Sequence, residues 1–232
     1  MNELYVLIIS AGSLGFIHTI LGPDHYLPFI ALSRARKWSG SKTLWITFFS
    51  GIGHVGSSVL IGLIGIGLGI SLNKLEAFET FRGELVGWLL LAFGIGYTFY
   101  GIYKYFKSSH HHHLPKFLTP KKIRGLEHLP TSEQDQDNTR ITPWILFLIF
   151  VFGPCEVLIP MLIFPAYENS TFGMFAVALV FGIATVATML FAVYIGYKGT
   201  SLLKFKKHEK YVHLIAGLII LFSGTGIVFL GW

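Results

Sequence analysis

The sequence contains few charged residues: only 13% are Asp, Glu, Lys or Arg, against roughly a quarter in ordinary soluble domains. Hydrophobic residues account for 53% of the 232 positions. This composition excludes an ordinary water-soluble domain, whose surface needs more charge. It predicts a membrane protein whose first partner is the lipid bilayer.

Cysteine is nearly absent, because Cys155 is the only one in the chain. A single cysteine excludes an intramolecular disulfide and any relay between two thiols of this chain. A basic segment is also lacking before the first apolar stretch, which is long enough to span a bilayer. We therefore expect no cleavable signal peptide and a first helix that stays in the membrane.

Long uncharged stretches are abundant instead. They run from Leu4 to Pro23, Thr43 to Asn73, Leu85 to Tyr103, Ile141 to Cys155, Asn169 to Tyr197 and Tyr211 to Trp232. Most of them meet the ~20 apolar residues that a spanning helix needs. The fourth is interrupted by Glu156, after which the apolar character resumes. We therefore predict an all-α membrane protein with six transmembrane helices.

Basic residues predict the orientation of these helices. Given six spans, most of the 18 Lys and Arg residues fall on one face: Arg34, Arg36, Lys37, Lys42, Lys104, Lys107, Lys116, Lys121, Lys122, Arg124, Arg140, Lys198, Lys204, Lys206, Lys207 and Lys210. The opposite face has only Lys74 and Arg82. The positive-inside rule then places both termini outside the plasma (inner) membrane. Topology thus accounts for the net charge of +6, and we expect no nucleic-acid partner.

The two halves of the chain resemble each other at an offset of 131 residues. This offset lays GPDH at 22–25 over GPCE at 153–156, and GIGHV at 51–55 over GIATV at 182–186. At an offset of 130, four glycines of the third helix (87, 94, 96 and 101) fall on glycines of the sixth (217, 224, 226 and 231). A unit of three helices has odd parity, so the second copy must be inverted. We predict two inverted three-helix repeats, at 1–106 and 141–232, joined by a cytoplasmic loop at 107–140.

Gly-Pro pairs interrupt the first and fourth helices of this arrangement. Pro23 and Pro154 lack an amide proton, and Gly22 and Gly153 relax the backbone beside them. In inverted-repeat transporters, such broken helices meet at a binding site near the midplane. The two breaks therefore predict a site at the repeat interface, with a pair of packing kinks as the simpler alternative.

Ionisable side chains lie next to these breaks, where insertion into lipid is costly and each side chain needs a partner. His18 and His25 are two helical turns apart, and the break can turn Asp24 toward them. Imidazoles with a carboxylate suit Ni, Co, Zn or Fe. We predict that His18, Asp24, His25 and His54 bind a divalent transition metal, assisted by Glu156 from the second repeat. The alternative for each histidine is a hydrogen-bonded core residue.

Two further features are candidates for metal binding. Cys155 takes the repeat position of Asp24, as an additional ligand or as a small buried hydrophobe. The loop at 107–140 has a composition typical of disorder and carries the histidines His110, His111, His112, His113 and His128. Unstructured histidine tracts bind divalent metals, so we expect metal capture there.

These motifs resemble the nickel/cobalt transporter superfamily, which includes hydrogenase- and urease-linked nickel permeases and urease-accessory-type membrane proteins. His18, Asp24 and His25 look like its first signature, SRARKWSGSK like its basic loop, and FFSGIGH with His54 like its second signature. The resemblance covers residues 15–62 and lacks further histidines after His54. It implies a membrane transporter with nickel or cobalt as substrate, rather than an enzyme.

Other functions stay open. GPCEVLIP resembles the Pro-Cys motif of the membrane thiol–disulfide electron carriers of cytochrome c maturation, although those need a pair of cysteines. Half-helix N-termini at Gly22 and Gly153 could hold an oxyanion, as in the distantly similar sulfite exporters. A membrane accessory protein that scaffolds metalloenzyme maturation, and a homo-oligomer, also fit the sequence.

Overall fold

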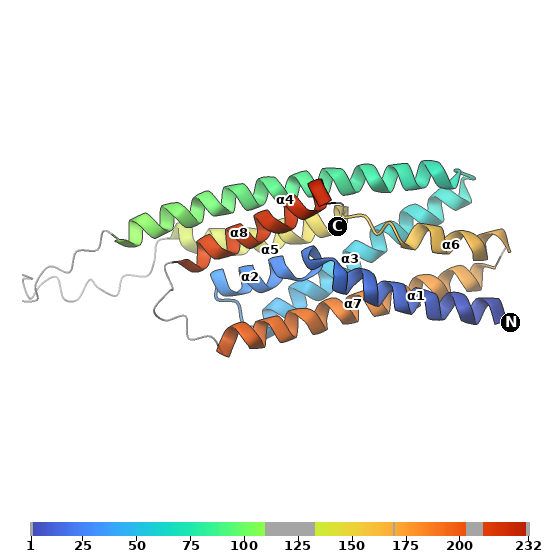
Figure 1. Cartoon of the computed structure of the whole chain (residues 1–232), viewed down its shortest axis with the longest axis horizontal. Helices are drawn as coiled ribbons and strands as arrows, with labels where there is room; N and C mark the ends of the chain where they lie inside the picture. The colour runs from blue at the N-terminus through green and yellow to red at the C-terminus, as the bar shows by residue number, and fades with distance from the viewer. Residues whose placement is uncertain (1, 110–132, 169, 203–210, 231–232) are drawn as a thin grey trace, which may run out of the picture.

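The structure, a computed structural model, describes residues 2–109, 133–168, 170–202 and 211–230 (Figure 1). These residues form α1 (Asn2–Leu21), α2 (Leu27–Ala35), α3 (Gly40–Gly67), α4 (Leu72–Ser109), α5 (Glu133–Phe152), α6 (Leu158–Tyr167), α7 (Thr171–Leu202) and α8 (Val212–Thr225). A 3₁₀ turn, η1 (Pro23–His25), joins α1 to α2, and a π-helical turn, η4 (Gly226–Leu230), follows α8. No strand occurs in these ranges, so the expected all-α class is confirmed.

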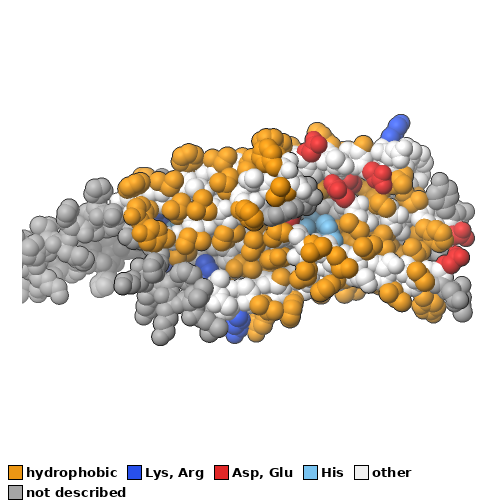
Figure 2. Space-filling model, in the orientation of Figure 1, with side chains coloured by type: hydrophobic (Ala, Val, Ile, Leu, Met, Phe, Trp, Pro, Cys, Tyr) orange, Lys and Arg blue, Asp and Glu red, His pale blue; other side chains and the backbone are white. Residues whose placement is uncertain are grey.

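Five helices are long and apolar enough to cross a membrane: α1, α3, α4, α7 and α8 together with η4. The apolar part of α5, Ile141–Phe152, is shorter. Hydrophobic side chains cover most of the molecular face in Figure 2. An exposed surface of this kind is stable against lipid but not against water. The chain is therefore an integral membrane protein with about five apolar spanning helices.

The third helix begins earlier than its hydropathy predicts. The uncharged stretch starts at Leu85, whereas α4 starts at Leu72 and carries Glu79 and Arg82 within its length. Arg82, which the sequence placed at a membrane face, is buried, with 7% of its surface exposed. That placement was wrong because a charge paired inside the bundle is not excluded from a spanning helix.

The connection between the two halves is only partly described. The helices α4 and α5 extend into the predicted loop at its two ends, through Ser109 and from Glu133. The loop histidines His110, His111, His112, His113 and His128 lie outside the described residues. Their predicted role in metal capture therefore stays a prediction.

Both expected helix breaks are present. The chain leaves helical geometry between Leu21 and Leu27 and again between Phe152 and Leu158. Elsewhere α4 packs along α8, α1 packs along α7, and α3 contacts both α5 and α7 (Figure 1). The first break contacts α8 and, through His25 and His54, α3. The second break contacts α3 and α4.

Glycines allow the long helices α4 and α8 to approach closely. A Cβ added at Gly94 would lie 2.5 Å from the backbone nitrogen of Leu221, and one added at Gly224 would lie 2.5 Å from that of Leu91. These contacts are reciprocal: in each helix the leucine lies the same number of residues before the glycine, Leu91 before Gly94 in α4 and Leu221 before Gly224 in α8. Backbone-to-backbone packing of small residues is a typical way to hold membrane helices together.

Candidate functional site

The first break turns the chain inward just after the end of α1. The Gly22 amide still donates to His18 O at 3.0 Å, but Pro23 has no amide to continue the ladder. The His25 amide donates to Gly22 O at 3.1 Å, which closes the short turn η1. This turn directs the side chains of Asp24 and His25 toward α3.

The imidazole of His25 is held by the turn itself. Its Nδ1 lies 3.1 Å from Gly22 O and 3.2 Å from Asp24 Oδ2, and the residue is only 5% exposed. Both neighbours of Nδ1 are acceptors, so the proton of the neutral ring belongs on Nδ1. The lone pair of Nε2 then remains available to a ligand.

Three imidazoles from different elements stack edge to face. The ring centroids of His18 and His25 are 4.8 Å apart, and those of His25 and His54 are 5.1 Å apart. With Asp24 beside His25, this arrangement brings together the four residues that the sequence proposed as a site. We call these four residues the His–Asp cluster.

Several polar atoms of the His–Asp cluster lack a hydrogen-bond partner among the described residues. They are His18 Nε2, Asp24 Oδ1 and His25 Nε2. The fourth residue, His54, is held by the Phe150 backbone. All four side chains line a cavity of about 770 Å³ that also reaches Gly153 and Glu156. Buried polar groups are normally satisfied, so a cluster of unsatisfied ones facing a cavity indicates a ligand or a chemical role.

Cys155 lies directly behind this cavity. It is completely buried, and its sulfur and one ring nitrogen each of His18 and His54 all lie within 4.8 Å of one another. Glu156, the next residue, lines the cavity but is exposed and lies outside this group. The structure therefore brings the thiol closer to the imidazoles than the sequence suggested, and the carboxylate less close.

The second break is fastened by Arg82, which reaches across from α4. Its Nη2 donates to Gly153 O at 3.2 Å, to Val151 O at 3.3 Å and to Ser57 Oγ at 2.8 Å. These two carbonyls lie at the end of α5, where intrahelical donors run out. One guanidinium therefore satisfies both of them in the interior of the bundle.

Glu79 completes this fastening from the same helix. Its Oε2 accepts from the Cys155 amide at 3.1 Å and from Ser58 Oγ at 2.9 Å, while Oε1 pairs with Arg82. Ser58 Oγ also accepts from the Cys155 amide at 3.0 Å. We call Ser57, Ser58, Glu79 and Arg82 the clamp, because together they fix the backbone on both sides of Pro154.

The sequence interpretation missed the clamp. An acid and a base three residues apart on one helix face were a usable signal, since such pairs are neighbours in a helix. The two breaks therefore differ: the first leaves polar side chains unpaired at a cavity, whereas the second is held by an ion pair.

Comparison with known proteins places this architecture in a family. The family model described as the cytochrome c biogenesis protein transmembrane region matches residues 27–225. The chain belongs to this family. Searches of curated proteins and of solved structures each gave no significant match. The matched span includes His54 and Cys155, whereas His18, Asp24 and His25 precede it.

This finding shows that the assignment to the nickel/cobalt transporter superfamily was wrong. The nickel or cobalt transport inferred from that assignment was wrong as well. The motifs behind that resemblance cover residues 15–62, whereas the cytochrome c biogenesis family spans residues 27–225. Histidine and aspartate side chains at a helix break supply nitrogen and oxygen atoms that could bind a metal. Such atoms alone do not specify what a membrane protein transports. The Pro-Cys motif at Cys155 was the better guide.

Proposed function

We propose that this chain is a membrane thiol–disulfide electron carrier of the cytochrome c biogenesis type, with Cys155 as its reacting sulfur. The family match supports this function, and one observation carries it: the thiol follows the second break and lies within 4.8 Å of His18 and His54 ring nitrogens. A thiol attacks as the thiolate, so it needs a base to accept its proton. The His54 ring nitrogen that lies within 4.8 Å of the sulfur provides one.

Because the chain has one cysteine, the other sulfurs of the reaction come from partner proteins. The Cys155 thiolate attacks an acceptor disulfide, which forms a mixed disulfide and releases one acceptor thiol. A thiol of a donor protein then attacks the Cys155 sulfur and releases the second acceptor thiol. The other donor thiol displaces Cys155, which recovers its proton. Two electrons thus pass from a donor dithiol to an acceptor disulfide.

Access to Cys155 requires a local movement of the second break. The side chain is 0% exposed, but its neighbours Gly153, Pro154 and Glu156 line the cavity. A shift of this short non-helical segment, with α5 and α6 in place, would bring the sulfur to the cavity wall. The clamp holds this segment and therefore controls how often the sulfur is exposed.

The proposed function is tested by electron transfer across proteoliposomes. A reduced dithiol protein is placed on one side of the membrane and a disulfide protein on the other. We expect reduction of the second protein by the full chain, loss of that reduction in Cys155→Ser, and retention in Ser223→Ala, a buried serine that donates to Ile219 O of its own helix. Transfer that survives Cys155→Ser removes the proposal, and so does an inactive unmodified chain.

A second candidate is a resident transition-metal ion at the His–Asp cluster. The observation that favours it is that His18, His25 and His54 line one cavity, where the Nε2 atoms of His18 and His25 have no hydrogen-bond partner among the described residues. Two imidazoles with the thiolate of Cys155 form a ligand set suited to Zn and Cu, and the imidazoles with Asp24 suit Ni, Co, Zn or Fe. An ion bound to the sulfur would block its exchange reaction.

Metal content of purified protein tests this second candidate. Elemental analysis should find bound metal in a variant that lacks residues 110–132 and little in His25→Ala or His54→Ala. His213→Gln is the matched control, because this buried histidine pairs with Tyr97 at the α4–α8 contact. If the variant without residues 110–132 loses its metal while His25→Ala and His54→Ala keep theirs, the loop histidines and not the helices bind the metal.

The proposed architecture in the membrane has six spans in two inverted repeats, with α5 and α6 together as the fourth. The reciprocal contacts of Gly94 and Gly224 support it. The helix pairs support it too: α1 contacts α7, and the corresponding helices of the other repeats, α5 and α3, also contact each other. Basic residues on the α2–α3, α4–α5 and α7–α8 connections support termini outside the inner membrane.

A further inference from the structure

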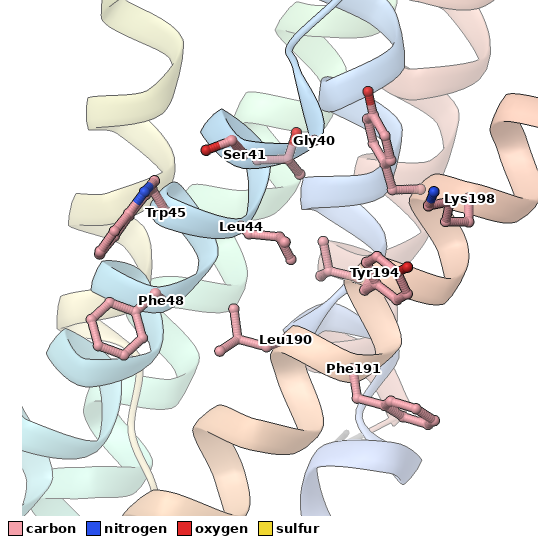
Figure 3. A pocket seen from close by; sticks show the side chains of 12 residues that line it. Gly40, Ser41, Leu44, Trp45, Phe48, Leu190, Phe191, Tyr194 and Lys198 are labelled. Atoms are coloured by element: carbon pink, nitrogen blue, oxygen red, sulfur yellow. The ribbon is translucent and has the colours of Figure 1, made fainter.

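A second cavity, unrelated to the His–Asp cluster, lies between the start of α3 and the end of α7. Its volume is about 850 Å³, which falls within the ~300–1,000 Å³ typical of small-molecule sites. Leu44, Trp45 and Phe48 of α3 and Leu190 and Phe191 of α7 supply its apolar wall (Figure 3). We call this cavity the α3–α7 groove.

The groove changes from polar to apolar along its length. Figure 3 shows Ser41 and Lys198 toward one end, and Phe48 and Phe191 toward the other. Phe48 lies seven residues after Ser41, and Phe191 lies seven residues before Lys198. At 1.5 Å of rise per helical residue, each step is about 10 Å, so the polar end and the apolar end are well separated.

The polar end of the groove is positively charged. Lys198 stands over the Tyr194 ring at 5.7 Å, and Lys42, one residue from Ser41, stands over the Trp38 ring at 5.7 Å. Neither contact neutralises the ammonium groups. Arg34 also lies at this end, where it donates to Thr200 Oγ1 and Tyr197 O of α7.

The groove opens sideways to the surface that faces lipid. Trp45 is 58% exposed and Phe191 is 60% exposed, although both line the groove. Aromatic side chains with this exposure are stable in a bilayer and unfavourable in water. A ligand therefore enters from the membrane and not from the aqueous phase.

We propose that the α3–α7 groove binds an anionic phospholipid from the surrounding bilayer. One acyl chain lies between Leu44 and Leu190, and the phosphate lies at Lys198. This occupant matches the apolar length of the groove, its positive end and its lateral opening. A zwitterionic lipid would match the apolar part only, because its own cation offsets the phosphate near Lys198.

The experiment uses the full chain in vesicles that contain phospholipids with brominated acyl chains, which quench nearby tryptophan. Subtracting the signal of Trp45→Phe isolates the quenching of Trp45. We expect brominated phosphatidylglycerol to associate about five-fold more strongly than brominated phosphatidylcholine, the factor expected for one lysine near an anionic headgroup. Equal quenching by the two lipids overturns the proposal.

Two variants locate the preference. Lys198→Gln should remove the preference for phosphatidylglycerol. Lys104 lies over the Tyr100 ring on α4, away from the groove, so Lys104→Gln should keep the preference. An equal loss in both variants would mean a general surface charge and overturns the site. Leu190→Phe fills the groove and should reduce quenching by both lipids.

Inorganic phosphate distinguishes a lipid site from a free anion site. Added to the vesicles, it should leave the quenching unchanged, because it carries no acyl chain. Displacement of the brominated lipid by phosphate alone overturns the proposal. The electron transfer that depends on Cys155 is measured separately, so failure of one proposal leaves the other standing.

Discussion

At the scale of single residues, the ion pair of Glu79 and Arg82 decides how Cys155 is presented. Both side chains are buried, with 1% and 7% of their surfaces exposed, and every bond they make fixes the second break or its serine supports. A buried pair of this kind contributes little net stability, but the loss of one partner leaves an unpaired charge. The pair therefore acts mainly by setting the position of the thiol.

Arg82→Gln should destabilise the protein by about 3–5 kcal/mol, because Glu79 then remains buried without its partner. Thermal unfolding in detergent measures this loss. Glu79→Leu combined with Arg82→Met should recover part of it, and Lys74→Gln, an exposed change in the same helix, should be neutral. If the single Arg82 variant unfolds like the unmodified chain, the pair has no structural role.

The same variants report on the position of the thiol. We expect Cys155 to react with a membrane-permeant maleimide faster in the double variant than in the unmodified chain, because its amide loses the Glu79 acceptor. Lys74→Gln provides the control again. Unchanged reactivity in a folded double variant would show that Glu79 does not hold the second break.

At this scale the sequence placed the residues of the His–Asp cluster in one site, and metal binding by that site stays a prediction. The structure brings together the four residues that the sequence grouped, His18, Asp24, His25 and His54. The grouping was possible because a Gly-Pro break in an apolar helix is a local signal, and because ionisable side chains that are costly to insert into lipid need a partner. The Glu79–Arg82 pair is local, but the clamp was missed because its other bonds join residues more than 20 positions apart. Sequence patterns cannot show which distant backbone amide a carboxylate meets.

At the scale of elements, the contact between α4 and α8 depends on positions where no side chain fits. A Cβ at Gly94 would meet the Leu221 backbone at 2.5 Å, so the helices would have to separate. At Gly96, two residues along the same helix, a Cβ would meet nothing within 4 Å. The two glycines therefore form a matched pair for an experiment.

Gly94→Ala should destabilise the protein by about 1–3 kcal/mol through overpacking against backbone atoms that cannot move aside. Gly96→Ala should have no effect, or stabilise α4 slightly through better helix propensity. Thermal aggregation followed by size-exclusion chromatography in detergent compares the two variants. Equal effects would contradict a packing role for Gly94.

Helix existence was predictable at this scale, and helix length was not. Long uncharged stretches identified α1, α3, α4, α7 and α8, because a bilayer admits few other sequences. The start of α4 was wrong because hydropathy ends a span at the first charges, whereas Glu79 and Arg82 neutralise each other inside the bundle.

At the scale of the whole molecule, Figure 2 shows most of its Lys and Arg side chains toward the end of the α2–α3 connection, with one such group at the opposite end, where Asp and Glu mainly lie. This asymmetry gives the bundle a preferred direction in a membrane, since positive residues remain in the cytoplasm. Family membership adds no direction of its own. Orientation therefore rests on charge alone and is open to a direct measurement.

Single cysteines in a Cys155→Ser background test that orientation in intact cells. Glu3→Cys near the start of α1 and Lys74→Cys at the start of α4 should react with a membrane-impermeant maleimide added outside. Lys37→Cys, in the connection between α2 and α3, should react only after the cells are permeabilised. The reverse labelling pattern would contradict the predicted orientation.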